Sequence, residues 1–289
     1  MEWHNILDPD SPELDRLAER YHLHPLHIED CRHRDQNAKI EEADGYIFTV
    51  MKGLRCDGSG VLEAADFDIF LGADFVITVV ETDWPEFCSL AGEVKKSKGS
   101  NLRADQIYYQ LVDHVVDSYL PILDRYDDLI DGLEDKALGK ASPETLSEIF
   151  TAKRNLILLR RVLINTRDVA GHLQRTEASL IQRDMWPFLR DVYDHVTRNL
   201  DTVEMQRDLL TGALDVYLSS VANRTNQVMK ILTVLGTIFL PAVVVTGFYG
   251  MNVQGLPGAS SAHGMAIAVG VIVGSTALLL VMLKHFDWL

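Results

Sequence analysis

The stretch NQVMKILTVLGTIFLPAVVVTGFYGMN, Asn226–Asn252, contains one of the two long apolar runs of the chain. Within it, Ile231–Tyr249 are 19 consecutive residues without Asp, Glu, Lys, Arg or His, and Met265–Leu283 form a second run of 19. A helix needs about 20 residues to cross the ~30 Å hydrocarbon core of a bilayer. We therefore predict two transmembrane helices, 231–249 and 265–283, joined by a loop at 250–264. Two buried helices of a soluble protein are the alternative.

Basic residues around the two runs predict their orientation. Arg224 and Lys230 precede the first run and Lys284 follows the second, whereas the loop 250–264 has no Lys or Arg. Cytoplasmic segments next to membrane spans carry an excess of Lys and Arg. Both termini, including the tail 284–289, are therefore expected in the cytoplasm, and the loop is expected outside.

The chain of 289 residues is acidic, with a formal net charge of −15 from 42 acidic and 27 basic side chains. This balance argues against nucleic acid as a partner, because Lys and Arg are what bind phosphates. It fits a cationic partner such as a metal ion, and equally the ordinary solubility of a cytosolic domain. Cys31, Cys56 and Cys88 are far apart and predict reduced thiols. No signal or transit sequence is evident, so we expect a bacterial or archaeal plasma membrane protein.

Residues 1–100 predict a small α/β layer in the cytosol. Ser11-Pro12-Glu13 is typical of a helix start, with Ser as the cap and Pro in the first turn. Three stretches rich in β-branched and aromatic residues, separated by turn residues, predict strands with antiparallel connections. They are Gly45–Leu54, Val61–Leu71 and Phe75–Val80.

Residues 101–230 predict long cytosolic helices and a stalk. Apolar residues at periods of three and four indicate a helix over Arg103–Lys136 that ends at Gly139, and a second from Ser142 to about Arg183, as an antiparallel pair. A third helix is expected to start at Trp186-Pro187 and to continue through Pro241 to Tyr249. At 1.5 Å per residue this helix is roughly 95 Å long, so it must join the cytosolic body to the membrane as a stalk.

The chain shows no signature of a known enzyme class, and we expect it not to be an enzyme. The two spans lack the charged or imidazole groups that pumps use as proton relays, which favours a passive conduit. Because two spans cannot enclose a pore, a conduit requires a symmetric oligomer with one helix of each subunit around the axis.

One face of the first span is the candidate pore lining. Steps of three and four residues connect Asn226, Met229, Leu232, Gly236, Leu240, Val243 and Gly247. Apolar rings of this kind suit a constriction that closes by dewetting. Ordinary packing between helices favours small residues as well and is an equal alternative.

Two further groups of polar residues could attract cations. Asp194, Asp201, Asp208 and Asp215 recur every seven residues of the stalk, and Asp191 and His195 are one turn apart. For such a stripe, an ordinary solvated helix face is the favoured interpretation. Near the N-terminus, the chain concentrates possible zinc ligands: His22, His24, His27, Glu29, Asp30, Cys31 and His33. Their spacing is not that of a structural zinc site, so ordinary helix and loop is the favoured interpretation.

Several motifs of the chain together resemble those of one known family. Tyr249-Gly250-Met251-Asn252, at the end of the first span, is similar to the signature of the CorA-type magnesium transporters. The other matching stretches, in chain order, are His24-Pro25-Leu26 with Glu29-Asp30, Arg190–His195, Leu214–Ser220 and Asn226–Pro241. The closing Lys284 with Trp288-Leu289 fits as well, so the resemblance extends from about Trp3 to the C-terminus.

The resemblance implies a homopentameric membrane channel for Mg²⁺, with Co²⁺ as a related cargo and no prosthetic group. Gly250, Met251 and Asn252 would form the selectivity motif, with a ring of Asn252 at the outer mouth. Mg²⁺ would also be a regulatory ligand between subunits, bound by Asp30 and Asp191, with Glu29 and Asp113 nearby. The match at Trp3 lies inside the family's N-terminal domain, so this domain is expected to be short here.

Two departures from the family pattern concern the ion. Many members have an acidic residue two positions after the Asn, where this chain has Gln254, and the whole loop 250–264 lacks Asp and Glu. The loop is also somewhat similar to that of the zinc-transporting branch. A transporter of Zn²⁺, Co²⁺ or Ni²⁺ with the same fold is therefore the first alternative. A membrane-anchored coiled-coil scaffold without transport is the second.

Overall fold

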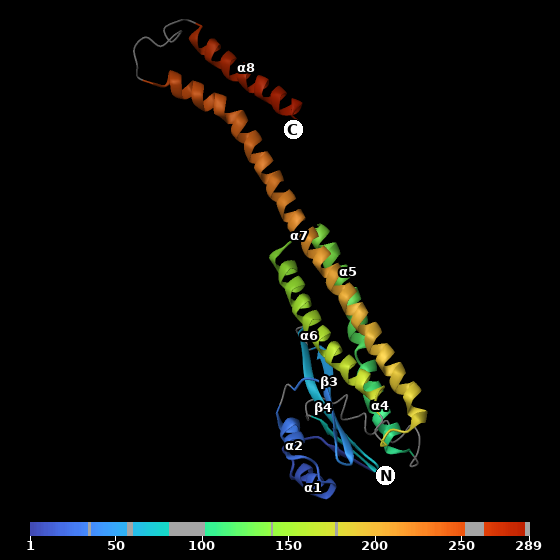
Figure 1. Cartoon of the computed structure of the whole chain (residues 1–289). Coiled ribbons are helices and arrows are strands. Elements are labelled where there is room, and N and C mark those ends of the chain that lie inside the picture. The colour runs from blue at the N-terminus through green and yellow to red at the C-terminus, as the bar shows by residue number, and fades with distance from the viewer. Residues whose placement is uncertain are drawn as a thin grey trace. The chain divides into compact units, whose positions relative to one another are not determined.

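The computed structural model describes residues 1–33, 36–56, 60–80, 102–139, 141–176, 179–251 and 263–286. They divide into two compact units, Met1–Val216 and Tyr217–Leu289. The first unit combines a β-sheet with helices, and the second holds the two apolar helical segments (Figure 1). An α/β domain, a long helix and two C-terminal apolar helices are thus present, as the sequence predicts.

The first unit contains a five-stranded sheet with the strand order β1-β5-β4-β3-β2. Its strands are β1 (Glu2–Ile6), β2 (Lys39–Ala43), β3 (Tyr46–Cys56), β4 (Leu62–Gly72) and β5 (Phe75–Val80). The three predicted strands are confirmed as β3, β4 and β5, and they pair antiparallel. Sequence patterns miss β1, which is parallel to β5, and β2, which is antiparallel to β3. Both are five-residue edge strands in which most positions are partly exposed, so they lack the apolar pattern of a buried strand.

Two short helices cover one face of this sheet. They are α1 (Pro12–Tyr21), capped as predicted by the Ser11 side chain, and α2 (Pro25–Arg32). Apolar side chains of both helices form one core with alternate residues of β3 and β5 and with Phe70 of β4. At the β4–β5 turn, a Cβ on Gly72 would lie 2.1 Å from the Phe75 ring, so this turn requires glycine.

The opposite face of the sheet packs against α4 (Ala104–Asp117) and α6 (Pro143–Leu173). The Thr49 hydroxyl of β3 lies 2.7 Å from the Tyr108 hydroxyl of α4. Asn155 of α6 bridges to the strand connection, since its Oδ1 accepts from Leu62 N at 3.1 Å and its Nδ2 donates to Gly60 O at 2.8 Å. The sheet is therefore tied to the helices on this side by polar as well as apolar contacts.

The helical part differs from the prediction in two places. The single helix predicted over Arg103–Lys136 is wrong: it is divided into α4 and α5 (Leu120–Gly139). The cause is Pro121, which has no N–H to bond the carbonyl of Asp117. The predicted end of the next helix near Arg183 is also wrong, because α6 ends at Leu173 and the 3₁₀ turn η1 (Arg183–Met185) follows.

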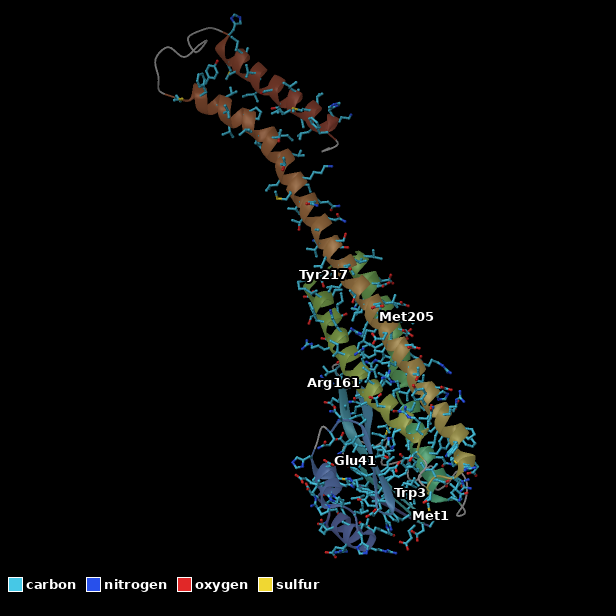
Figure 2. All side chains as sticks on the ribbon, in the orientation of Figure 1. Met1, Trp3, Glu41, Arg161, Met205 and Tyr217 are labelled. Carbon is cyan, nitrogen blue, oxygen red and sulfur yellow. The ribbon has the colours of Figure 1, made fainter. Side chains whose placement is uncertain are left out.

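The last two helices confirm the predicted long helix and second apolar run. α7 spans Trp186–Tyr249, 64 residues with Pro241 inside, and α8 spans Gly264–His285. Within the first unit, α7 buries one face, including Val192, Val196 and Val203. Figure 2 draws the side chains along this helix and labels Met205 and Tyr217. In the second unit, every side chain from 221 to 230 is exposed.

Both apolar segments are long and hydrophobic enough to cross a membrane. The windows that qualify have mean hydropathies of 2.3 in α7 and 2.6 in α8, and only 6% and 0% of their residues are buried within the chain. Helices of a soluble core would be mostly buried. The alternative of two buried soluble helices is therefore not what the structure shows.

Candidate functional site

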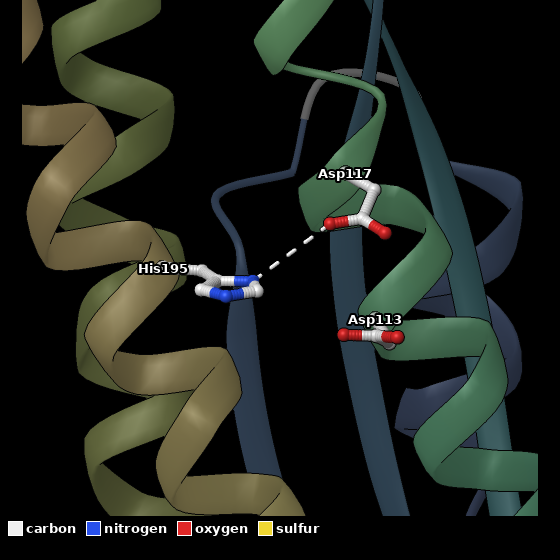
Figure 3. A group of neighbouring side chains, drawn as sticks. All are labelled: Asp113, Asp117 and His195. Carbon is white, nitrogen blue, oxygen red and sulfur yellow. Dashed lines mark ion pairs between the residues drawn. The ribbon is translucent and has the colours of Figure 1, made fainter.

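Two carboxylates and an imidazole meet between α4 and α7 in the first unit (Figure 3). Asp113 and Asp117 are one helical turn apart and therefore share a face of α4, and His195 projects toward them from α7. One ligand atom from each of the three residues lies within 4.8 Å of the others. In the part of the chain that the structure describes, this is the one group with metal-binding geometry.

The two carboxylates of α4 repel one another, Asp113 from a partly buried position and Asp117 from an exposed one. Burial raises the pKa of Asp113, and the charge of Asp117 raises it further. The Tyr109 hydroxyl donates to Asp113 Oδ2 at 3.2 Å and opposes this rise. Burial and Asp113 raise the pKa of Tyr109 to about 12, so its hydroxyl remains a donor. A bound cation would relieve the repulsion between the carboxylates.

The ring of His195 lies between three carboxylates without a close partner. Its Nδ1 is 3.8 Å from Asp117 Oδ1, and its Nε2 is 3.6 Å from Asp191 Oδ2, one turn earlier on α7. Both distances exceed that of a hydrogen bond, and Nδ1 is a buried atom with no hydrogen-bond partner. Carboxylate oxygens suit Mg²⁺, and an added imidazole suits transition metals as well. The cluster is therefore a candidate divalent-cation site.

Asp30 and Glu29 lie on α2, on the other side of the sheet from α4. Asp30 is half-buried, and its Oδ2 accepts a hydrogen bond from Lys39 Nζ at 2.7 Å. Glu29 is exposed. Asp30 does not belong to the cluster of its own chain, so the pairing of Asp30 with Asp191 across a subunit boundary stays a prediction.

The candidate pore lining lies on one uncovered face of α7 in the second unit. All seven predicted residues are in the helix and exposed, for example Leu232 at 63% and Leu240 at 59%. A Cβ on Gly236 or Gly247 would meet nothing within 4 Å in the chain. Polar groups on this segment are satisfied internally, because the hydroxyls of Thr233, Thr237 and Thr246 donate to the carbonyls four residues before them. The face is thus free to meet a pore axis or another helix.

Gly250, the first residue of the predicted selectivity motif, directly follows the end of α7 at Tyr249. Gly250 N donates to Thr246 O at 2.8 Å, and a Cβ on Gly250 would lie 2.9 Å from that same oxygen. Glycine therefore allows this tight helix end. Met251 follows, exposed, whereas Asn252, Gln254 and the rest of the loop as far as residue 262 lie outside the described residues.

Comparison with known proteins gives the family. Residues 1–285 match the family described as "CorA-like Mg2+ transporter protein". The chain belongs to this family. It is 36% identical over 277 residues to the cobalt/magnesium transport protein CorA of Thermotoga maritima, a match that covers 95% of this chain and 79% of that protein. Members of the CorA family are transporters rather than catalytic enzymes.

Two further known proteins show how far the likeness extends. The solved structure of the CorA magnesium transporter from Methanocaldococcus jannaschii superposes with a TM-score of 0.87 at 23% identity, covering 99% of this chain and 91% of that chain. The zinc transport protein ZntB of Yersinia enterocolitica is 25% identical over 180 residues, 62% of this chain and 55% of that protein. The first likeness shows the CorA fold, and the second shows that zinc transporters are among its relatives.

Within this CorA fold, sequence reasoning missed one residue of the cluster, and for the His22–His33 segment its favoured interpretation as ordinary helix and loop agrees with the structure. Asp117 was missed, although its spacing from Asp113 was a usable signal. In the His22–His33 segment, the buried His27 contacts the Tyr46 hydroxyl at 2.8 Å and Glu41 Oε2 at 3.0 Å. Burial raises the pKa of the Cys31 thiol well above its usual range. The described residues of this segment form no cluster of metal ligands.

Proposed function

We propose that this chain forms a homopentameric channel in the plasma membrane that admits Mg²⁺ and is gated by cytosolic Mg²⁺. The observation that carries the proposal is membership of the CorA family over residues 1–285, which include both candidate spans. The relative from Thermotoga maritima is named for cobalt and magnesium transport. With two spans per chain, a pore requires several copies around an axis.

The proposed pore runs along the exposed face of α7. Leu232, Gly236 and Leu240 would form the narrow apolar part, and Asn226 and Asn252 would stand near its two ends. Mg²⁺ gives up its water shell reluctantly. A ring of neutral Asn252 carbonyls can accept hydrogen bonds from those waters and hold the hydrated ion without trapping it. Basic residues near the spans support cytoplasmic termini.

The substitution Asn252→Ala tests the pore. It should abolish Mg²⁺ uptake into proteoliposomes while the protein elutes from a sizing column as the same oligomer. The matched control is Asn165→Ala on α6, which removes an amide whose bond is to another side chain, Asn37, at 3.3 Å. Mg²⁺ uptake by Asn252→Ala at the wild-type rate would contradict the proposed role of this residue.

The α4–α7 cluster supports the proposed regulation. Asp113, Asp117 and Asp191 place three carboxylates around His195, and Asp30 of a neighbouring subunit would complete the site. At high cytosolic Mg²⁺ the ion would bridge the subunits and hold the pore shut. When Mg²⁺ falls, repulsion among the carboxylates would loosen the ring.

The substitution Asp191→Lys tests this regulation. It places an ammonium where the ion would bind, so Mg²⁺ influx should continue at millimolar internal Mg²⁺, where the wild type closes. Asp201→Lys is the control, because Asp201 is an exposed carboxylate of the same helix outside the cluster. A closing response of Asp191→Lys equal to that of the control would count against this site but not against the channel.

A transporter of Zn²⁺, Co²⁺ or Ni²⁺ is the second candidate, favoured by the imidazole of His195 in the cluster and by the acid-free loop. Isotope uptake with Mg²⁺ and Zn²⁺ in competition separates the two candidates. A scaffold without transport predicts no flux and tolerance of Asn252→Ala. Membership of a transporter family counts against it.

A further inference from the structure

Lys39 forms an ion pair with Asp30, the carboxylate that is proposed above to bind regulatory Mg²⁺. Its Nζ lies 2.7 Å from Asp30 Oδ2 on α2 and 2.7 Å from Glu41 Oε1 on its own strand, β2. The same ammonium lies 5.8 Å from the centre of the Phe48 ring on β3. Three elements thus hold this one cation in place.

The groups around Lys39 are themselves fixed. The other oxygen of Glu41 bonds the ring of His27, which is buried and stacks on Phe48 at 4.6 Å between ring centres. The side chains of Lys39 and Asp30 are 31% and 21% exposed, so this pair is less solvated than a free surface pair. Burial lowers the pKa of Lys39, but hydrogen bonds to Asp30 and Glu41 outweigh it and raise the pKa.

We propose that the Lys39 ammonium is an internal competitor for the divalent cation that Asp30 binds, and that it sets the cytosolic Mg²⁺ concentration at which the channel closes. This inference rests on the proposed function. A Mg²⁺ ion at Asp30 must either displace Lys39 or bind beside its positive charge, and both weaken the binding of the ion. Among the described residues, Lys39 is the cation that contacts Asp30.

Competition predicts a shift whose direction distinguishes it from a purely structural role. In Lys39→Met the side chain can still cover Phe48, but the charge is gone. We expect the internal Mg²⁺ concentration that halves influx to fall about fivefold, the size typical of one partly exposed ion pair. If Lys39 only held α2 in place, its loss would loosen the site, and the same concentration would rise.

The experiment measures Mg²⁺ influx into vesicles of the full chain against Mg²⁺ on the cytosolic side. Lys39→Gln is a second neutral variant in case Lys39→Met does not assemble, and Lys39→Arg keeps the charge and should remain near wild type. Lys136→Met is the matched control, since Lys136 pairs with Glu148 at 2.5 Å far along α5, with more than half of its side chain exposed. This control should leave unchanged the internal Mg²⁺ concentration that halves influx, which we term the closing concentration.

A second measurement removes the competitor and its target together. In an Asp30→Asn background, Lys39→Met should no longer shift the closing concentration, because the carboxylate they share is gone. An unchanged or raised closing concentration in Lys39→Met, or the same shift with and without Asp30, would overturn the inference. Either result leaves the proposed function intact, whereas a wild type that transports no Mg²⁺ or never closes contradicts the proposed function itself.

Discussion

The side chain of Asp68 on β4 is a buried carboxylic acid, only 2% exposed. The nearby ammonium of Lys52 pairs instead with Asp66, two residues earlier on β4, because Lys52 Nζ lies 2.5 Å from Asp66 Oδ1. Burial raises the pKa of Asp68 to about 8, the charges of Asp66 and Asp30 raise it too, and the Cys31 thiol and Lys52 oppose the rise. Asp68 is therefore mostly protonated in the folded chain at neutral pH.

This buried acid predicts a pH dependence of stability. Between the usual carboxyl pKa of about 4 and the folded value of about 8, the folded state keeps a proton that the unfolded state has lost, so stability falls as pH rises. Asp68→Asn removes this dependence. Its thermal stability relative to wild type should improve with pH up to about pH 8 and then level off, by at most about 1.4 kcal/mol per pH unit. For the exposed control Asp128→Asn, the difference in stability from wild type should stay constant from pH 5 to 9. The same constant difference for Asp68→Asn would contradict this prediction.

Among the helices and strands, the sequence predicts those whose bounds are determined by neighbouring residues in the chain. The start of α1 at Ser11-Pro12, the strands β3 to β5 and the full length of α7 follow from caps, turns and apolar periodicity. The break before α5 was also readable, because Pro121 cannot continue a helix. The end of α6 was not, because tertiary bonds hold the following segment: Thr176 donates to Glu42, and Asp105 Oδ2 accepts from Gln182 N at 3.1 Å.

Asn155 links α6 to the sheet, and we predict how much its loss lowers the stability of the fold. Asn155 is 5% exposed and satisfies two backbone groups of the β3–β4 connection. Asn155→Ala leaves both without a partner and should lower the free energy of unfolding by about 1–3 kcal/mol. Asn165→Ala on the same helix should cost within about 0.5 kcal/mol, because its amide is near solvent. Thermal unfolding of the two variants in detergent checks the difference, and equal transition temperatures would show that the link contributes nothing.

For the whole molecule, motifs predict the family and the fold, whereas the proposed regulatory site needs geometry that the sequence does not contain. The Gly-Met-Asn motif and four ordered stretches are local patterns and can be found in one chain. The approach of Asp113 and Asp117 on α4 to His195 depends on how α4 and α7 pack. The proposed meeting of Asp30 with Asp191 would depend in addition on a second copy of the chain.

We propose that this chain conducts Mg²⁺ under the control of cytosolic Mg²⁺. The most direct test is isotope influx into proteoliposomes of the full chain, with Mg²⁺, Co²⁺, Ni²⁺ and Zn²⁺ supplied separately and in competition, at low and high Mg²⁺ on the cytosolic side. We predict Mg²⁺ influx that is large at low cytosolic Mg²⁺, is suppressed at high Mg²⁺ and is not displaced by an equal concentration of Zn²⁺. Mg²⁺ influx no greater than in protein-free vesicles, with or without Zn²⁺ flux, would contradict the account.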